Sequence, residues 1–168
     1  MNLILLQPDD AWISADQVRL VGRRADHIRQ QLKAVLGQNV RVGLMGGPQG
    51  TAEITALDAD AVVLSVALDQ PPPPRHRFDV VLALPRPKML RRIFRTAAEF
   101  GVGQLHLINS ARVEKSFWQT PLLKPDKVAE ALQAGMERAR DTIAPQVHLH
   151  QRFRPFVEDE LSALCAGR

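Results

Sequence analysis

The sequence predicts a two-domain α/β protein, with a small β-rich domain followed by the first part of a parallel-sheet domain. Four consecutive prolines, Pro71–Pro74, divide the 168 residues, and such a run fits neither a helix interior nor a central strand. Short strand-like runs dominate before the prolines, whereas strand-like and helix-like segments alternate after them. We therefore place a β domain at residues 1–70, a linker at 71–77 and an α/β domain at 78–168.

The first 70 residues predict a small sheet or barrel of about five strands and one helix. Apolar residues recur at i, i+4, i+7 and i+8 from Ile28, which predicts a helix over residues 25–36 with Gly37 as its C-cap. The segment Gly46–Gly50 predicts a hairpin turn, because it lacks the Gly-Lys-Ser/Thr ending of a phosphate-binding loop. The strand candidates are short apolar or alternating runs at residues 3–6, 17–20, 39–45, 51–57 and 61–68.

The remaining residues predict a parallel sheet with crossover helices. Residues 78–84 are apolar except for Asp79, a run typical of a strand buried on both faces. Pro85 and Pro87 end it and open a helix that starts near Lys88, buries Met89 among other apolar residues and ends at Gly101. The next expected elements are a strand at 104–108, a helix at 125–141, a strand at 147–149 and a helix at 156–164. Because open parallel sheets normally have more than three strands, we expect the chain to be part of a longer protein.

Charge and cysteine content restrict the functional classes. The first 70 residues carry 6 Lys/Arg and 8 Asp/Glu, whereas the others carry 16 of the 22 basic and 10 of the 18 acidic residues. Segregated basic charge is typical of polyanion binding, and an ordinary solvated surface explains it equally well. The single cysteine, Cys165, excludes a disulfide framework and a cysteine-based zinc site, and fits a cytoplasmic protein. No segment is long enough to span a membrane.

The segment from Arg86 to Arg95 is the strongest binding candidate, with five basic residues and no acidic one. Lys88, Arg91 and Arg95 share one helical face, where like charges repel unless an anion offsets them. The segment follows a parallel strand, at the edge where open α/β sheets bind ligands. The alternative is a solvated face whose charges pair elsewhere, for example Arg95 with Glu99.

Two further segments add basic candidates. The first helix offers Arg29 and Lys33, although an amphipathic surface is nearly as good an explanation. Arg112 and Lys115 lie beside Phe117-Trp118, which suits base stacking, but aromatic residues more often pack inside. The candidate nucleic-acid-binding residues of the three segments are Arg29, Lys33, Arg86, Lys88, Arg91, Arg92, Arg95, Arg112 and Lys115.

No residue pattern identifies a reaction. His148 and His150 share a strand face, but no carboxylate or cysteine set accompanies them, so we expect no metal site. Ser110, Ser116 and Cys165 lack the surroundings of a nucleophile. The catalytic residues therefore remain unknown.

Short motifs occur in order along both predicted domains: His27-Ile28, Leu32-Lys33, Gly37, Gly46–Gly50, Leu84 through Lys88-Met89, Ala98–Val102, Ser110–Arg112 and Glu137–Arg140. This ordered set resembles the RsmE-type 16S ribosomal RNA (uracil-N3)-methyltransferases of bacteria. The chain departs from that family in its Met1-Asn2-Leu3 start, which lacks an Arg-rich opening, and in Thr96, where a lysine is usual. The family's later Gly-Pro-Glu-Gly-Gly and Leu-Arg-x-Glu-Thr-Ala segments do not occur in these residues.

The resemblance implies a fold and an activity. It implies a PUA-like β-barrel domain that holds RNA, followed by a SPOUT (α/β knot) methyltransferase domain that forms a homodimer. It implies transfer of a methyl group from S-adenosylmethionine to N3 of a uridine in 16S ribosomal RNA. Because the missing segments form the cofactor site, we expect that site beyond residue 168 and an inactive chain on its own. The alternatives are a stand-alone RNA-binding module and an enzyme that binds a small anion at Arg86–Arg95.

Overall fold

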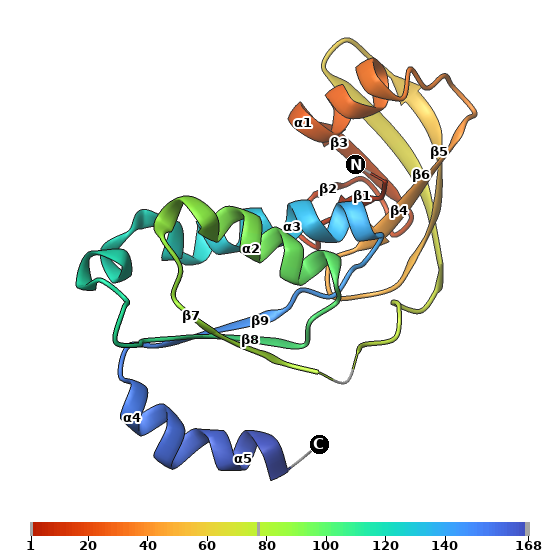
Figure 1. Ribbon diagram of the computed structural model, residues 1–168. Helices are drawn as coiled ribbons and strands as arrows, with labels where there is room; N and C mark the ends of the chain where they lie inside the picture. The colour runs from red at the N-terminus through yellow and green to blue at the C-terminus, as the bar shows by residue number, and fades with distance from the viewer. Residues whose placement is uncertain (1, 77, 167–168) are drawn as a thin grey trace. The chain divides into compact units, whose positions relative to one another are not determined.

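A computed structural model describes residues 2–76 and 78–166, which divide into two compact units (Figure 1). Unit 1 comprises Met1–Pro73 and Met136–Ile143, and unit 2 comprises Pro74–Gly135 and Ala144–Arg168. The first boundary lies inside the proline run. The sequence analysis placed Met136–Ile143 in the second domain, whereas in the structure this segment belongs to unit 1.

Unit 1 is a curled sheet of six strands in the order β1-β4-β5-β6-β3-β2. The pair β1–β4 is parallel and the other pairs are antiparallel. The inward faces of the strands enclose a core that includes Leu6, Val18, Val42, Ile54 and Leu64. The strands are β1 (Ile4–Leu6), β2 (Ala11–Trp12), β3 (Gln17–Val21), β4 (Asn39–Leu44), β5 (Gln49–Leu57) and β6 (Ala61–Gln70).

The five expected strands of unit 1 are present, and the structure adds β2. This strand has only two residues, Ala11–Trp12, which is too short to leave a periodic pattern. The turn between β4 and β5 confirms the expected hairpin at Gly46–Gly50. Gly46 takes a φ of +75°, a left-handed conformation that suits glycine in such a turn.

The helix expected over residues 25–36 is wrong in its extent. Helix α1 covers Gly22–Asp26, a π-helical turn covers His27–Gln31, and Lys33 takes a φ of +49° that ends the helical path. The N–H groups of Leu32 and Ala34 close this end by donating to the carbonyls of His27 and Ile28. Leu32 and the following Val35 and Leu36 are therefore exposed, and Gly37 caps no helix.

Unit 2 is a parallel three-stranded sheet in the order β7-β8-β9, which confirms the expected alternation of strands and helices. Helices α2 and α3 cover one face, and the C-terminal helical segment lies on the other (Figure 1). The strands are β7 (Val80–Ala83), β8 (Gln104–Ile108) and β9 (Gln146–His150). The helices are α2 (Pro87–Glu99), 3-10 turns at Lys115–Gln119 and Pro121–Leu123, α3 (Pro125–Ala139), α4 (Phe153–Pro155), a π-helical turn at Phe156–Glu160 and α5 (Leu161–Ala166).

Two burial expectations for unit 2 fail. Strand β7 is an edge strand with Val81 44% exposed, so its apolar run is not buried on both faces. Met89 is 37% exposed, because the buried stripe of α2 consists of Leu90, Phe94, Ala97 and Ala98. Among the described residues, no helix combines the length and apolar character needed to cross a bilayer.

Helices α2 and α3 approach closely at Gly135. A Cβ added at this glycine would overlap the carbonyl oxygen of Arg95 and lie 2.8 Å from the Cβ of Ala98. Glycine in a helix interior costs about 1 kcal/mol relative to alanine. The close packing of the two helices is the physical reason for glycine at this position.

We predict that Gly135→Ala destabilises the protein, although alanine is the better helix former. Forcing a methyl group against backbone costs about 1–3 kcal/mol and outweighs the gain in propensity. Urea unfolding followed by circular dichroism measures the change. Ala134→Gly, at the exposed neighbouring position, is the control and should cost about 1 kcal/mol. An increase in stability of Gly135→Ala would contradict the packing argument.

Candidate nucleic-acid interface

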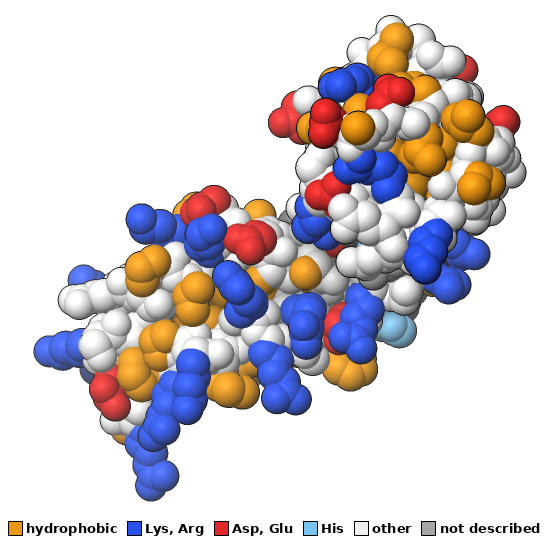
Figure 2. Space-filling model, turned by 90° about the horizontal axis from the view of Figure 1, so that it is seen from above, with side chains coloured by type: hydrophobic (Ala, Val, Ile, Leu, Met, Phe, Trp, Pro, Cys, Tyr) orange, Lys and Arg blue, Asp and Glu red, His pale blue; other side chains and the backbone are white. Residues whose placement is uncertain are grey.

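The basic residues of α2 lie on its exposed side, as their spacing predicts. Lys88, Arg91, Arg92 and Arg95 are all exposed, and Arg86 is the exposed N-cap residue. Figure 2 looks onto the α2–α3 side of unit 2 and shows more Lys and Arg than Asp and Glu there, with hydrophobic side chains between them. The first turn of α2 carries no acidic residue, so the positive end of the helix dipole adds to this charge.

Only weak ion pairs occupy these side chains. Arg91 Nη2 lies 3.8 Å from Glu130 Oε1, and Arg95 Nε lies 3.4 Å from Glu99 Oε1. Exposed pairs of this kind contribute about 0–1 kcal/mol and yield readily to a stronger anion. The pairing of Arg95 with Glu99 that the sequence offered is present. Because such a pair is weak, the α2 face can still bind phosphate groups.

The segment after β8 combines exposed basic and half-buried aromatic residues. Arg112 and Lys115 are exposed, and Lys115 begins a 3-10 turn. Phe117 and Trp118 are half-buried, and the indole Nε1–H of Trp118 donates to Asn109 Oδ1 at 3.4 Å. Both rings are therefore partly packed against the protein. The sequence favoured packing over base stacking for these two aromatic residues.

The two candidates of unit 1 differ in availability. Arg29 donates to the Asp26 carboxylate at 2.6 Å and to the Asp58 carbonyl at 3.3 Å. Its side chain is only 22% exposed, so much of its charge is already used in the fold. Lys33 is exposed at the left-handed position that ends the π-helical turn.

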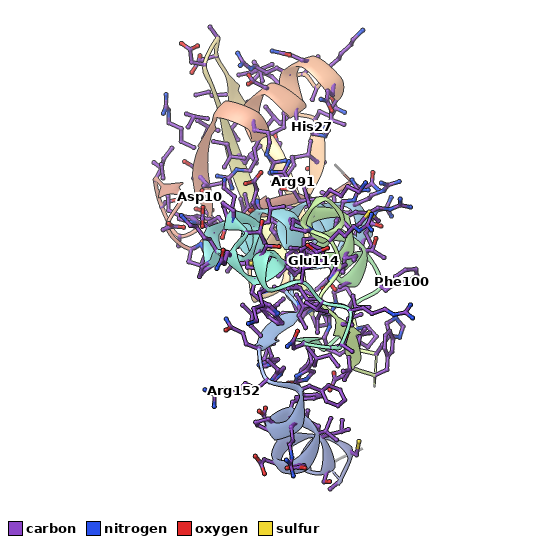
Figure 3. The ribbon with its side chains drawn as sticks, turned by 60° about the vertical axis from the view of Figure 1, so that its left-hand side comes forward. Asp10, His27, Arg91, Phe100, Glu114 and Arg152 are labelled. Atoms are coloured by element: carbon purple, nitrogen blue, oxygen red, sulfur yellow. The ribbon has the colours of Figure 1, made fainter. Side chains whose placement is uncertain are left out.

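An apolar groove of about 380 Å³ lies between β7 and α2. Phe78, Leu82, Met89 and Phe100 are among its lining residues, and Arg92 is the one charged residue there. Phe100 is 64% exposed and projects from the end of α2 (Figure 3). Such a groove suits an apolar contact, and only Arg92 among its lining residues could pair with an anion.

Three histidines, His106, His148 and His150, cluster on the face of the sheet of unit 2 opposite the groove. His150 Nδ1 lies 3.4 Å from Glu160 Oε2, and His106 Nδ1 lies 3.0 Å from His150 Nε2. Because a carboxylate only accepts, neutral rings would donate in sequence from His106 to His150 to Glu160. His148 stacks on His106 with ring centroids 4.6 Å apart. Burial of His106 lowers its pKa, and repulsion from His148 and His150 lowers it further, against attraction to Asp79 and Glu160.

The cluster acts in packing. The ring of Phe156 lies 4.4 Å from that of His150 and 5.8 Å from that of His106, so the C-terminal helical segment packs on these rings. Within residues 2–76 and 78–166, no three His, Cys, Asp or Glu side chains come together as metal ligands. The sequence analysis did not identify His106, because no recognisable motif surrounds it in β8. The register of β8 with β9 places it directly beside His148.

Glu137 is a buried acidic residue that pairs with an arginine of unit 1. It is 3% exposed, and its carboxylate receives both Nη groups of Arg23, at 2.9 and 2.6 Å. Its carbonyl accepts the N–H groups of Asn2 and Leu3, both at 3.0 Å. This geometry gives Glu137 a structural role in unit 1.

Comparison with known proteins identifies relatives of the whole chain. A family model described as RNA methyltransferase domain matches residues 71–166. The ribosomal RNA small subunit methyltransferase E of Treponema pallidum (strain Nichols) is 26% identical over 157 residues, which are 93% of this chain and 59% of that protein. The chain therefore spans about three fifths of the length of this relative.

Solved structures share the fold. A probable rRNA methyltransferase from Porphyromonas gingivalis aligns with a TM-score of 0.72 at 17% identity, over 97% of this chain and 66% of that one. A ribosomal RNA small subunit methyltransferase E from Neisseria gonorrhoeae, bound to S-adenosyl methionine, aligns with a TM-score of 0.70 at 16% identity, over 96% and 66%. Both alignments extend through both units.

We predict that the histidine cluster makes stability depend on pH. A lowered pKa means that the unfolded chain binds more protons than the folded one, so the free energy of unfolding falls as pH drops below the ordinary value of 6.5. Above 6.5 His106 contributes no pH dependence. His106→Phe should reduce the slope below pH 6.5, where one proton accounts for at most about 1.4 kcal/mol per pH unit.

Urea unfolding at a series of pH values measures this slope. His76→Phe, at an exposed position outside the cluster, is the matched control. Equal slopes for wild type and His106→Phe below pH 6.5 would show that the cluster does not cause the pH dependence.

Proposed function

The chain belongs to the RsmE-type family of RNA methyltransferases, and from this premise we propose that it binds ribosomal RNA through α2. Unit 1 would be a PUA-like domain that holds RNA, and unit 2 the front part of a SPOUT methyltransferase domain. The observation that carries the proposal is the exposed basic face of α2, directly after the carboxyl end of β7. Open α/β sheets bind ligands at this edge.

We propose that the whole protein methylates N3 of a uridine in 16S ribosomal RNA, with S-adenosylmethionine as methyl donor. The names of the Treponema pallidum and Neisseria gonorrhoeae relatives support a small-subunit RNA substrate and this cofactor. The uracil-N3 position, a homodimer and a cytoplasmic location rest on the family resemblance. A stand-alone RNA-binding module is the alternative.

The apolar groove beside α2 does not fit S-adenosylmethionine by itself. The cofactor carries an ammonium, a carboxylate and a sulfonium group, which need polar partners once they leave water. The groove beside α2 offers only Arg92 and Thr96 among apolar side chains. We therefore derive no catalytic step from these residues and assign cofactor binding to the part of the relatives that this chain does not span.

The α2 face acts in positioning. Lys88, Arg91 and Arg95 project from one side of a helix, at a spacing that lets each meet a phosphate of an RNA backbone. Such contacts fix the register of the nucleic acid without reading its sequence. Arg86 and Arg92 widen the face on α2, and Arg112 and Lys115 add basic charge after β8.

We predict that the triple variant Lys88→Glu, Arg91→Glu, Arg95→Glu weakens RNA binding and its dependence on salt. Each lost phosphate contact should reduce the slope of log K against log salt by about 0.7–0.9. Fluorescence anisotropy with a 16S-derived RNA fragment, at several salt concentrations, measures both quantities.

The matched control is Arg154→Glu on α4, which reverses an exposed arginine on the other side of the sheet. It should change the slope little. An unchanged slope in the triple variant would show that α2 is not part of the RNA interface. If the wild type then bound inorganic phosphate and the variant did not, a small anion would be the ligand of α2.

We also predict that the 168-residue chain alone does not bind S-adenosylmethionine tightly. Isothermal titration calorimetry should give no stoichiometric heat, while the same RNA fragment still binds. Tight, one-to-one cofactor binding to residues 1–168 would overturn this prediction.

A further inference from the structure

Unit 1 contains a polar pocket of about 320 Å³ that none of the interface candidates lines. Ile4 and Val40 form part of its apolar floor. The polar groups of its wall come from four segments that are distant in sequence: Asn2, His27, Gln38, Asn39, Arg41 and Arg140. Its volume lies at the lower end of the range for small-molecule sites.

His27 provides an unused hydrogen-bond acceptor in this wall. It is 7% exposed, and its Nδ1 lies 2.7 Å from Gln31 Oε1. An amide oxygen only accepts, so Nδ1 carries the hydrogen and the Nε2 of the neutral ring is left as an acceptor. Nε2 is buried, and no described residue supplies a donor to it. A buried polar atom without a partner is costly, and a ligand hydroxyl or N–H would remove that cost.

Two arginines supply positive charge. Arg41 on β4 and Arg140 after α3 are both exposed, and no carboxylate of the described residues lies within salt-bridge distance of either. Gln38 accepts the Val35 N–H through Oε1, which leaves its amide N–H groups available to donate. The pocket therefore combines anion binding with donors and one buried acceptor.

Arg140 occupies a backbone position that usually holds glycine. Arg140 has a φ of +59°, and the N–H of Asp141 donates to the carbonyl of Met136 at 3.0 Å. This is the left-handed position after a helix, where glycine is the usual residue. A side chain there costs about 1–2 kcal/mol. The fold tolerates that cost at the position where a guanidinium reaches the pocket.

We propose that this pocket binds one ribonucleotide of an RNA strand. Arg41 and Arg140 contact its phosphate, His27 Nε2 accepts from the ribose 2′-hydroxyl, and Gln38 and Asn39 contact the base edge. The 2′-hydroxyl is the group by which a protein distinguishes RNA from DNA. The inference rests on the proposed binding of RNA and adds a second contact site, in unit 1.

The decisive variant is Arg140→Gly, because glycine suits the backbone. It should keep or raise the melting temperature and weaken binding of a single-stranded oligoribonucleotide about 10-fold. Arg41→Ala should weaken binding by a similar factor. Arg19→Ala is the matched control, since Arg19 is an exposed arginine on β3 of the same sheet and lines no described pocket.

His27→Phe tests the acceptor. It should reduce the preference for the oligoribonucleotide over its deoxy counterpart, whereas the arginine variants should weaken both. Circular dichroism checks that the variant folds, and Arg140→Gly remains decisive if it does not.

The outcomes separate the two proposals. Normal RNA affinity in Arg140→Gly and Arg41→Ala, with a loss in the triple α2 variant, would overturn the pocket and leave the proposed function intact. Normal affinity in all of them would remove both. If the pocket variants lost binding of inorganic phosphate alone and kept RNA affinity, the site would be a small-anion site and the ribonucleotide proposal would fail.

Discussion

The segment Met136–Ile143 is the constraint on which unit 1 depends, because it supplies partners that the sheet cannot supply itself. The carbonyl of Glu137 satisfies two N–H groups at the start of the chain, just before β1. Its buried carboxylate binds Arg23 of α1, and Thr142 Oγ1 donates to the Gly47 carbonyl in the β4–β5 turn at 2.6 Å. Gly43 on β4 leaves space for the methyl group of Thr142, which a larger residue would displace. One short segment thus ties β1, α1 and β4 together.

Local patterns could not predict this tie. Arg23 and Glu137 are 114 residues apart, and the sequence around either residue does not indicate its partner. Strand alternation and the order of strands and helices depend on neighbours in sequence, so they predicted most elements of both units. The helix after Ala25 failed for a physical reason. Its apolar spacing continued past Gln31, but the left-handed turn at Lys33 redirected the chain and exposed Leu32.

The part of the candidate interface that lies on a single helix could be predicted from the sequence. The part that depends on segments brought together by the fold could not. The spacing of Lys88, Arg91 and Arg95 sufficed to place them on one exposed face. The pairing of Arg29 with Asp26 was not predicted, although residues three apart face each other on a helix. The pocket of unit 1 was not predictable, because Arg140 reaches it only through the return of the chain to this unit.

The two sites differ in how they would recognise RNA. The α2 face offers exposed charges, whose attraction for phosphate weakens with salt and carries no information about sugar or base. The pocket offers a buried acceptor whose tautomer is set by Gln31, and an acceptor discriminates a 2′-hydroxyl, which can donate to it, from a hydrogen, which cannot. An unsatisfied Nε2 and a left-handed arginine both lower the stability of the free protein. In the proposed complex both groups contact the ribonucleotide, so its binding would offset the cost of each.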